Sequence, residues 1–263
     1  IDKWYGYVEN FIGVSGRKEG LSQLPDGNFL PPLDMNCVEK DFKKNLFDKL
    51  GRTYTSGRVT NITKNHNGRG KCQSRNLCIR GCPYGAYFSS NSSTLPAAEA
   101  TGNMTLKTDS IVHSIIYDDE KNKATGVRVL DSETLEMTEY YARIIFLNAS
   151  TINSTLIMLN SKSRRFPNGF GNDSGELGHN IMDHHFKAGA RAQIDGYEDY
   201  YYHGNRPANG YLARFRNLGN EKMNYLRGFG YQGGAIRGGW ANSGEAAFTG
   251  ENLLKSASTP GGW

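Results

Sequence analysis

Three of the four cysteines in this chain lie close together, in the stretch from Lys71 to Ala86. Five residues separate Cys72 from Cys78, three separate Cys78 from Cys82, and Pro83 follows at once. A single loop of this length can turn three thiolates toward one point. Soft sulfur ligands select zinc, copper(I) or iron–sulfur clusters, and a cysteine run that ends in Cys-Pro is typical of iron–sulfur proteins. The spacing therefore favours a three-iron cluster, or a four-iron cluster with one exchangeable ligand.

Two other interpretations of this loop stay open from the sequence alone. One is a single disulfide plus a spare thiol, with Cys37 either as a disulfide partner or as a small buried hydrophobic side chain. The other is a structural zinc site, for which His66 could supply the fourth ligand. Closed zinc sites need four ligands and usually show a C-x2-C step, which this loop lacks. Zinc is therefore the less favoured metal.

The composition narrows the class of protein. A chain of 263 residues can form one large domain or two small ones, and its 32 glycines and 15 tyrosines favour a loop-rich, strand-containing enzyme over a helical bundle. The net charge of +5 is mild, and the basic residues are scattered, so we expect no nucleic-acid surface. No apolar run reaches the length of a transmembrane helix, and we expect no membrane segment. The chain starts at Ile1 without a methionine, as a processed protein or a fragment would.

The elements around the cysteine loop can be predicted from local patterns. Residues 1–36 are punctuated by glycine and proline and are expected to form an irregular cover. Apolar residues four apart predict an amphipathic helix from Val38 to Leu50, which Gly51 ends. The β-branched stretch Arg52–Thr63 predicts a strand that leads into the loop, and Leu95–Ala100 a short helix after it.

The most regular part of the chain follows. Alternating residues predict three strands joined by polar turns, at Leu106–Asp118, Ala124–Asp131 and Leu135–Tyr141. The apolar run Ala142–Ser150 predicts a buried strand, and a helix is expected over Thr151–Ser161. A buried strand, a small-residue turn and a helix N-terminus form a place where nucleotides contact α/β sheets, although an ordinary βα unit shows the same pattern.

Sequence patterns in the last third of the chain predict an antiparallel sheet followed by a poorly ordered tail. The Gly-rich loop Asn168–His185 is not a dinucleotide fingerprint, because no suitable strand precedes its glycines. Of the two histidines that end this loop, at most one is expected to face a pocket. A Gly- and Ser-rich tail from Gly233 is expected to be poorly ordered. Further strands are expected at Phe186–Ile194, Gly210–Arg216 and Tyr225–Gln232.

Taken together, these segments resemble the middle of a glucose–methanol–choline (GMC) flavoprotein oxidoreductase, from about Gly13 to His185. The nearest resemblance is to bacterial sugar dehydrogenases, such as the flavoprotein subunits of gluconate, glucose and glucoside 3-dehydrogenases. Some of these relatives carry a three-iron cluster on a C-x5-C-x3-C-P loop, which is the spacing found here. The matching segments come in the family's order: GVSGRKEG, LPDGNFLPP, GCPYGAYFSSNSSTLPAAEATGN, KATGVRV, IIFLNASTINSTLIMLNS and GNDSGELGHNIMDH.

The resemblance implies a fold and a division of the chain. The fold class is α/β plus α+β, with part of an FAD-binding Rossmann-like domain and a mostly antiparallel substrate-side sheet. Residues 1–55 would form an irregular cover and a helix of the substrate side, and 56–103 the cysteine-loop region. Residues 104–183 would belong to the FAD-binding domain, and 184–263 to the substrate-domain sheet and the tail.

The resemblance also implies particular site residues. The main chain of Val112 would touch the FAD adenine, Ala149 and Ser150 would line the adenosine end, and Ser154 would start the following helix. Family members often have Ser-Pro at that start, whereas this chain has Ser154-Thr155, which we interpret as subfamily variation. The metal ligands would be Cys72, Cys78 and Cys82.

Two parts of a complete family member have no counterpart here, so the chain is interpreted as an internal fragment. They are the N-terminal G-x-G-x-x-G unit, which holds the flavin pyrophosphate, and the C-terminal catalytic histidine with its His or Asn partner. No catalytic residue is therefore assigned within the chain. The fragment alone is expected to bind FAD weakly or not at all and to show no turnover.

The function implied for the whole protein is oxidation of a sugar or alcohol hydroxyl by FAD, with electrons leaving through a 3Fe–4S cluster. The implied partners are a cytochrome-type electron acceptor and a small chaperone-like subunit. A periplasmic location is expected, with a cytoplasmic one left open. One alternative is a GMC oxidase with a disulfide at the cysteine loop. Another is a non-catalytic carbohydrate-binding fragment.

Overall fold

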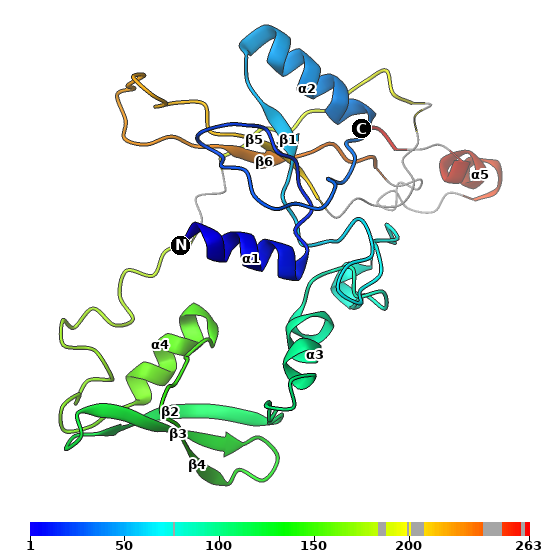
Figure 1. The fold of residues 1–263 in the computed structure, drawn as a ribbon. Helices are drawn as coiled ribbons and strands as arrows, with labels where there is room; N and C mark the ends of the chain where they lie inside the picture. The colour runs from blue at the N-terminus through cyan, green and yellow to red at the C-terminus, as the bar shows by residue number, and fades with distance from the viewer. Residues whose placement is uncertain (76, 184–187, 199, 201–207, 239–248, 259–260) are drawn as a thin grey trace. The chain divides into compact units, whose positions relative to one another are not determined.

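The computed structural model describes residues 1–75, 77–183, 188–198, 200, 208–238, 249–258 and 261–263 (Figure 1). The chain divides into two compact units. The first unit contains residues 1–104 and 189–263, and the second contains residues 105–188. Helices and antiparallel sheets are mixed in the described chain, as the sequence predicts. None of the described helices is long and apolar enough to cross a membrane.

The chain begins with a helix, α1 (Asp2–Ile12), and the prediction of an irregular start is wrong for these residues. The apolar side chains of Trp4, Tyr7, Val8 and Phe11 recur with helical spacing, and the rings of Tyr7 and Phe11 stack 6.2 Å apart. The helical spacing of these residues is hard to recognise in the sequence, because most of them are aromatic and glycines lie at positions 6 and 13. The helix ends at Gly13, whose φ of 75° is a left-handed conformation that glycine adopts without strain.

The second helix, α2 (Cys37–Leu50), confirms its prediction. Asn36 and Glu39 form a capping box: the Asn36 side chain accepts from the Glu39 N–H at 3.0 Å, and the Asn36 N–H donates to the Glu39 carboxylate at 3.1 Å. A left-handed Gly51 ends the helix. Phe42 packs edge-on against Tyr54, with ring centroids 5.0 Å apart, and so joins the helix to the sheet of the first unit.

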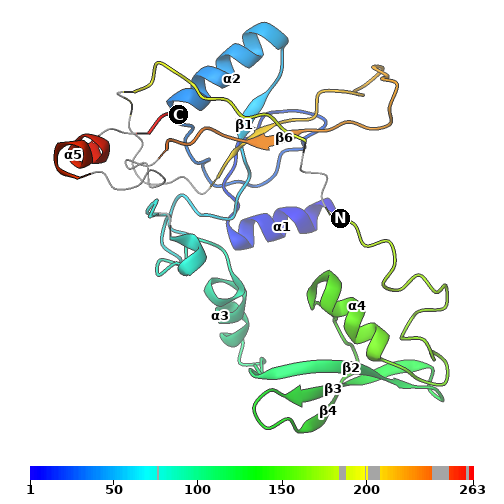
Figure 2. The ribbon, with the colours of Figure 1, turned by 180° about the vertical axis from the view of Figure 1, so that it is seen from behind.

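That sheet has three short antiparallel strands in the order β1-β5-β6 (Figures 1 and 2). They are β1 (Tyr54–Ser56), β5 (Gly210–Leu212) and β6 (Tyr231–Gly233), with Thr55 opposite Tyr211 and Tyr211 opposite Gln232. The antiparallel arrangement is as predicted, but each strand is shorter than expected. Beyond Ser56 the chain forms isolated bridges instead, because its partners there are single residues of loops.

Two predictions for the C-terminal part of the chain fail where it is described. Residues 188–194 form no strand, and Phe186 lies outside the described residues, as do His184 and His185. The tail is not wholly irregular, because it contains helix α5 (Gly250–Ser258) and ends on a buried Trp263. The indole N–H of Trp263 donates to the Tyr197 carbonyl at 3.1 Å, which fixes the chain end to the first unit.

The second unit is an antiparallel meander with one helix packed on it. Its strands are β2 (Ser110–Asp118), β3 (Lys123–Asp131) and β4 (Met137–Tyr141), in agreement with the three predicted strands. Helix α4 (Ser150–Asn160) also confirms its prediction. It packs on β2 through the buried Ile157, and the Ser161 hydroxyl accepts from the Ile115 N–H at 2.7 Å.

The predicted buried strand Ala142–Ser150 is absent. Residues 142–149 have no regular structure, and the side chains of Ile144 and Phe146 are 72% and 81% exposed. An apolar run forms a buried strand only where neighbouring strands pair with its backbone. Apart from the Ala142 N–H, which donates to the Thr125 carbonyl of β3 at 3.0 Å, no described strand pairs with this run. The second unit therefore presents a large apolar stretch at its surface.

Candidate functional site

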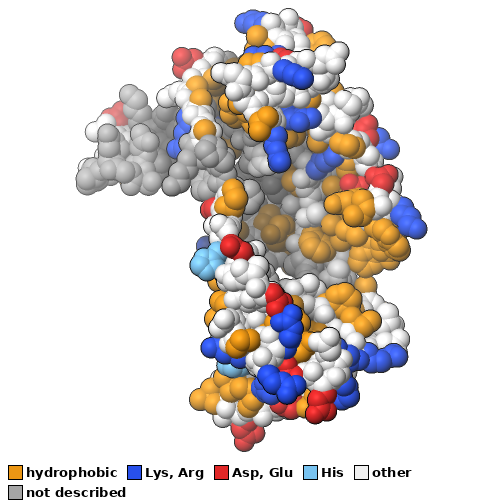
Figure 3. All heavy atoms as spheres, turned by 90° about the vertical axis from the view of Figure 1, so that its left-hand side faces the viewer, with side chains coloured by type: hydrophobic (Ala, Val, Ile, Leu, Met, Phe, Trp, Pro, Cys, Tyr) orange, Lys and Arg blue, Asp and Glu red, His pale blue; other side chains and the backbone are white. Residues whose placement is uncertain are grey.

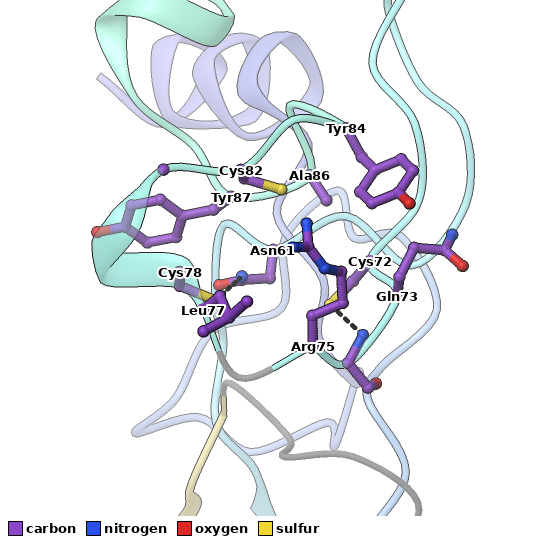
Figure 4. A pocket seen from close by; sticks show the side chains of 12 residues that line it. Asn61, Cys72, Gln73, Arg75, Leu77, Cys78, Cys82, Tyr84, Ala86 and Tyr87 are labelled. Atoms are coloured by element: carbon purple, nitrogen blue, oxygen red, sulfur yellow. Dashed lines mark hydrogen bonds between the residues drawn. The ribbon is translucent and has the colours of Figure 1, made fainter.

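The three cysteines of the loop line one open hollow in the first unit (Figure 4). Each cysteine side chain is partly buried. In the view of Figure 4, the side chains of Asn61 and Arg75 lie among the cysteines. The rest of the lining is formed by Gln73, Ser74, Leu77, Gly81, Tyr84, Ala86 and Tyr87. The structure thus brings Cys72, Cys78 and Cys82 to one place.

Backbone hydrogen bonds position this loop. The fully buried Ile62 lies beneath it: its N–H donates to the Ala86 carbonyl at 3.0 Å, and its carbonyl accepts from the Cys72 N–H at 2.8 Å. The Gly70 N–H donates to the Tyr84 carbonyl at 2.7 Å. Both ends of the loop are therefore attached to one buried segment, and the cysteines project from it.

Each cysteine sulfur receives at least one N–H donor. The Ser74 N–H donates to the Cys72 sulfur at 3.4 Å (Figure 4), and the Asn61 side-chain amide contacts the Cys78 sulfur at 3.9 Å. The Cys82 sulfur receives backbone N–H groups of the residues that follow it, Tyr84, Ala86 and Tyr87. Hydrogen bonds to sulfur stabilise thiolates and tune iron–sulfur clusters.

The surroundings of Cys82 stabilise its thiolate. Burial acts to raise the pKa of its thiol, but the backbone N–H groups of Tyr87, Tyr84 and Ala86, together with the charge of Arg75, lower the pKa by more. The pKa therefore lies below its ordinary value. A thiol in this state is prepared to bind a metal ion or to react as a nucleophile.

Arg69 is a structural anchor of the site that the sequence does not reveal. Its side chain is buried, and its guanidinium donates to the carbonyls of Gly85 at 2.8 Å, Ile12 at 2.6 Å and Ala86 at 3.4 Å. Burial lowers the pKa of Arg69, and the nearby charge of Cys82 acts in the opposite direction. In the sequence Arg69 resembles the exposed Arg80, so only its burial distinguishes it.

The structure also bears on the alternative interpretations of the loop. All four cysteines are free thiols, so no disulfide joins them. His66 is not part of the hollow, because its ring Nε2 donates to the Asn10 carbonyl at 2.5 Å. Within the described residues, no three His, Cys, Asp or Glu side chains are arranged to hold a metal ion. The thiols therefore offer the right donor atoms without converging on one point.

The residues expected to contact FAD lie in the second unit. Val112 pairs with Val129 near the start of β2, an edge strand of the meander. Ala149 precedes α4, and Ser150 begins it with a left-handed φ of 66°. Ser154 was expected to start this helix. It lies in the second turn instead, because the helix begins at Ser150. No side chain caps the N-terminus of α4, so its first N–H groups stay available to an anion.

The glycine-rich loop after α4 packs closely on that helix. The Phe170 N–H donates to the Met158 carbonyl at 2.8 Å. A Cβ atom at Gly169 would lie 3.0 Å from the backbone of Leu159, and its φ is 110°. Gly169 therefore allows the backbone of the loop to lie close to the backbone of α4.

Comparison with known proteins decides the family. A protein-family model described as "GMC oxidoreductase" matches residues 38–186. The chain belongs to the GMC oxidoreductase family. This confirms the resemblance predicted from the sequence, and the match includes the cysteine loop, the meander and α4.

Two known dehydrogenase proteins are similar to this chain over most of its length. The large subunit of fructose dehydrogenase from Gluconobacter japonicus is 24% identical over 191 residues, covering 70% of this chain and 34% of the relative. The 2-methyl-1,2-propanediol dehydrogenase from Mycolicibacterium austroafricanum is 27% identical over 184 residues, covering 69% of this chain and 32% of the relative. The chain thus matches about a third of the length of these relatives.

Proposed function

We propose that this chain is the central part of an FAD-dependent dehydrogenase that oxidises a sugar or alcohol hydroxyl. Membership of the GMC family supports an oxidoreductase acting on CH–OH groups. One relative is a dehydrogenase of a sugar and the other of a diol, which supports the substrate class. The observation that carries the proposal further is the hollow lined by three free thiols whose sulfurs all accept N–H groups.

Residues of the second unit would hold the adenosine end of FAD. A bound FAD supplies the hydride acceptor for the CH–OH carbon. The main chain of Val112 would contact the adenine, and Ala149, Ser150 and Ser154 would lie along the adenosine. The uncapped N-terminus of α4 fits a group with negative charge. In the complete Rossmann-like domain, the exposed run 142–149 would become a paired strand, and the residue that takes the hydroxyl proton would lie outside this chain.

Cys72, Cys78 and Cys82 would supply the ligands of a 3Fe–4S cluster, which carries electrons when bound. Binding requires the three sulfurs to move toward a common point, because in the described residues they are not arranged around one. The N–H groups around Cys82 would stabilise the negative charge of its sulfur throughout. Such a site suits a dehydrogenase better than an oxidase, because it gives the electrons an acceptor other than oxygen.

The remaining partners follow from the same proposal. A cytochrome-type protein would accept the electrons, and the relative that is a large subunit supports an enzyme of several subunits, with a small chaperone-like one among them. A periplasmic location would suit electron transfer to such a cytochrome.

The test is to quantify flavin, iron and acid-labile sulfide in the purified full-length protein. We expect stoichiometric FAD and an iron–sulfur signal in electron paramagnetic resonance. Replacing any one of the three loop cysteines with serine should remove most of the iron and leave the flavin bound. Cys37→Ser is the matched control, because Cys37 is also partly exposed but begins α2 outside the hollow. Flavin without iron in the unaltered protein would reject the cluster and favour an oxidase.

A further inference from the structure

The connection between β5 and β6, residues 213–230, is here called the basic arm. It projects from the sheet of the first unit as a long hairpin, orange in Figures 1 and 2. Its one acidic residue is Glu221, which pairs with Arg216 at 3.1 Å. Four basic residues and one acidic residue leave it with a net charge of 4 − 1 = +3. The basic residues are Arg214, Arg216, Lys222 and Arg227.

Hydrogen bonds within the basic arm hold it in a defined shape. The Asn217 side chain accepts from the Met223 N–H at 2.7 Å and donates to the Tyr225 carbonyl at 3.1 Å. A Cβ atom at Gly228 would lie 2.5 Å from the Arg216 carbonyl, so the two halves of the hairpin approach too closely for any other residue. The Gln23 side chain donates to the Arg214 carbonyl at 3.2 Å and fastens the base. The surface of the arm is therefore formed in advance of binding.

Apolar side chains cover part of this ordered surface. The rings of Phe215, Tyr225 and Tyr231 each contact Phe229, with centroids 5.6, 6.2 and 5.6 Å away. Tyr225, Phe229 and Tyr231 are still 39%, 45% and 46% exposed, and Leu226 is 93% exposed. Basic and hydrophobic side chains are interspersed on the side of the molecule that Figure 3 shows. Contiguous exposed apolar groups on an ordered element mark an interaction surface.

We propose that the basic arm is a docking surface for an acidic protein. Its positive charge selects and steers a negatively charged partner. Three of its four basic residues are arginines, and the guanidinium of Arg216 lies over the ring of Phe215, 5.7 Å from its centroid. The arm also contains Tyr225, Phe229 and Met223. This is the composition of protein interfaces, in which Arg, Tyr, Phe and Met are enriched and Lys is depleted. A membrane surface fits less well, because membrane-binding basic segments carry clusters of about four to eight Lys or Arg residues, whereas one of the four basic residues of the arm is already paired with Glu221.

This inference does not depend on the proposed oxidation, because no flavin or cluster residue lies in the arm. The test measures binding of the full-length protein to a random copolymer of glutamate and tyrosine, as an acidic polypeptide probe, by surface plasmon resonance at low and high salt. The double substitution Lys222→Glu and Arg227→Glu should weaken binding at least about tenfold at low salt. Leu226→Ser should weaken it about threefold, because an exposed apolar contact is lost.

Lys64→Glu with Lys107→Glu is the matched control, since it makes the same change of charge at two exposed residues that are not part of the arm. It should change the affinity less than twofold. Thermal unfolding of each variant checks that the protein stays folded. An equal loss of binding in both double variants, or no binding of the copolymer, would overturn the proposal. Binding to phosphatidylserine vesicles but not to the copolymer would instead assign the arm to a membrane surface.

Discussion

The two candidate sites of this chain differ in how much of each site the chain itself contains. In the first unit, the cysteine hollow rests on the buried Ile62 and Arg69, and the hydrogen-bond donors to its sulfurs come from the same stretch of the chain, residues 61–87. In the second unit, the run expected beside the flavin is exposed at Ile144 and Phe146. A loop site formed by local hydrogen bonds can form in a partial chain, whereas a strand site needs neighbours from elsewhere.

The largest effect is expected for the anchor of the cysteine hollow. Arg69→Met leaves the carbonyls of Ile12 and Gly85 without their Arg69 donor and should destabilise the first unit by about 3 kcal/mol, while the Ala86 carbonyl keeps the Ile62 N–H. Urea unfolding followed by tryptophan fluorescence measures this, because all three tryptophans belong to the first unit.

Arg80→Met is the control for this substitution, since Arg80 is exposed at the end of a short 3-10 helix in the same loop. It should change the stability by no more than about 0.5 kcal/mol. Equal effects of the two substitutions would show that the hollow does not depend on a buried anchor, and the contrast between the two sites would then lose its main support.

A smaller effect is expected at the N-terminus of α2, which is capped by a side chain whereas that of α4 is not. Asn36→Ala removes the acceptor for the Glu39 N–H and should cost about 1 kcal/mol. The same fluorescence measurement applies. Asn45→Ala, an exposed position within the same helix, should be neutral or slightly stabilising because alanine favours helices. A neutral Asn36→Ala would mean that packing alone holds α2.

The smallest effect is expected in the exposed run of the second unit. Phe146→Ser should change the stability of the 263-residue chain by less than about 0.5 kcal/mol, because the side chain is 81% exposed. Hydrogen exchange of α4 measures this. In the full-length protein the same substitution should release most of the FAD, since the residue would then be buried in a completed sheet. Normal flavin content there would contradict the proposed pairing of this run.

Much of the fold could be predicted from the sequence because it depends on local patterns. The period of Val38, Phe42 and Leu46 predicted α2, and alternation between polar turns predicted the meander of β2, β3 and β4. The spacing Trp4, Tyr7, Val8 and Phe11 also contained the signal for α1, although the prediction overlooked it. Family membership could likewise be recognised from the order of short segments.

The amino-acid sequence was enough to predict that three cysteines share one loop, that a strand meander precedes a helix, and that the chain belongs to the GMC oxidoreductase family. The folded structure was needed to show that Arg69 is buried while Arg80 is exposed, that N–H groups surround Cys82, and that residues 143–149 are not paired with a strand. Burial and strand pairing depend on segments that are distant in the sequence, so local patterns do not report them. The same apolar run would form a core strand if neighbouring strands paired with it, and it is an exposed segment where they do not.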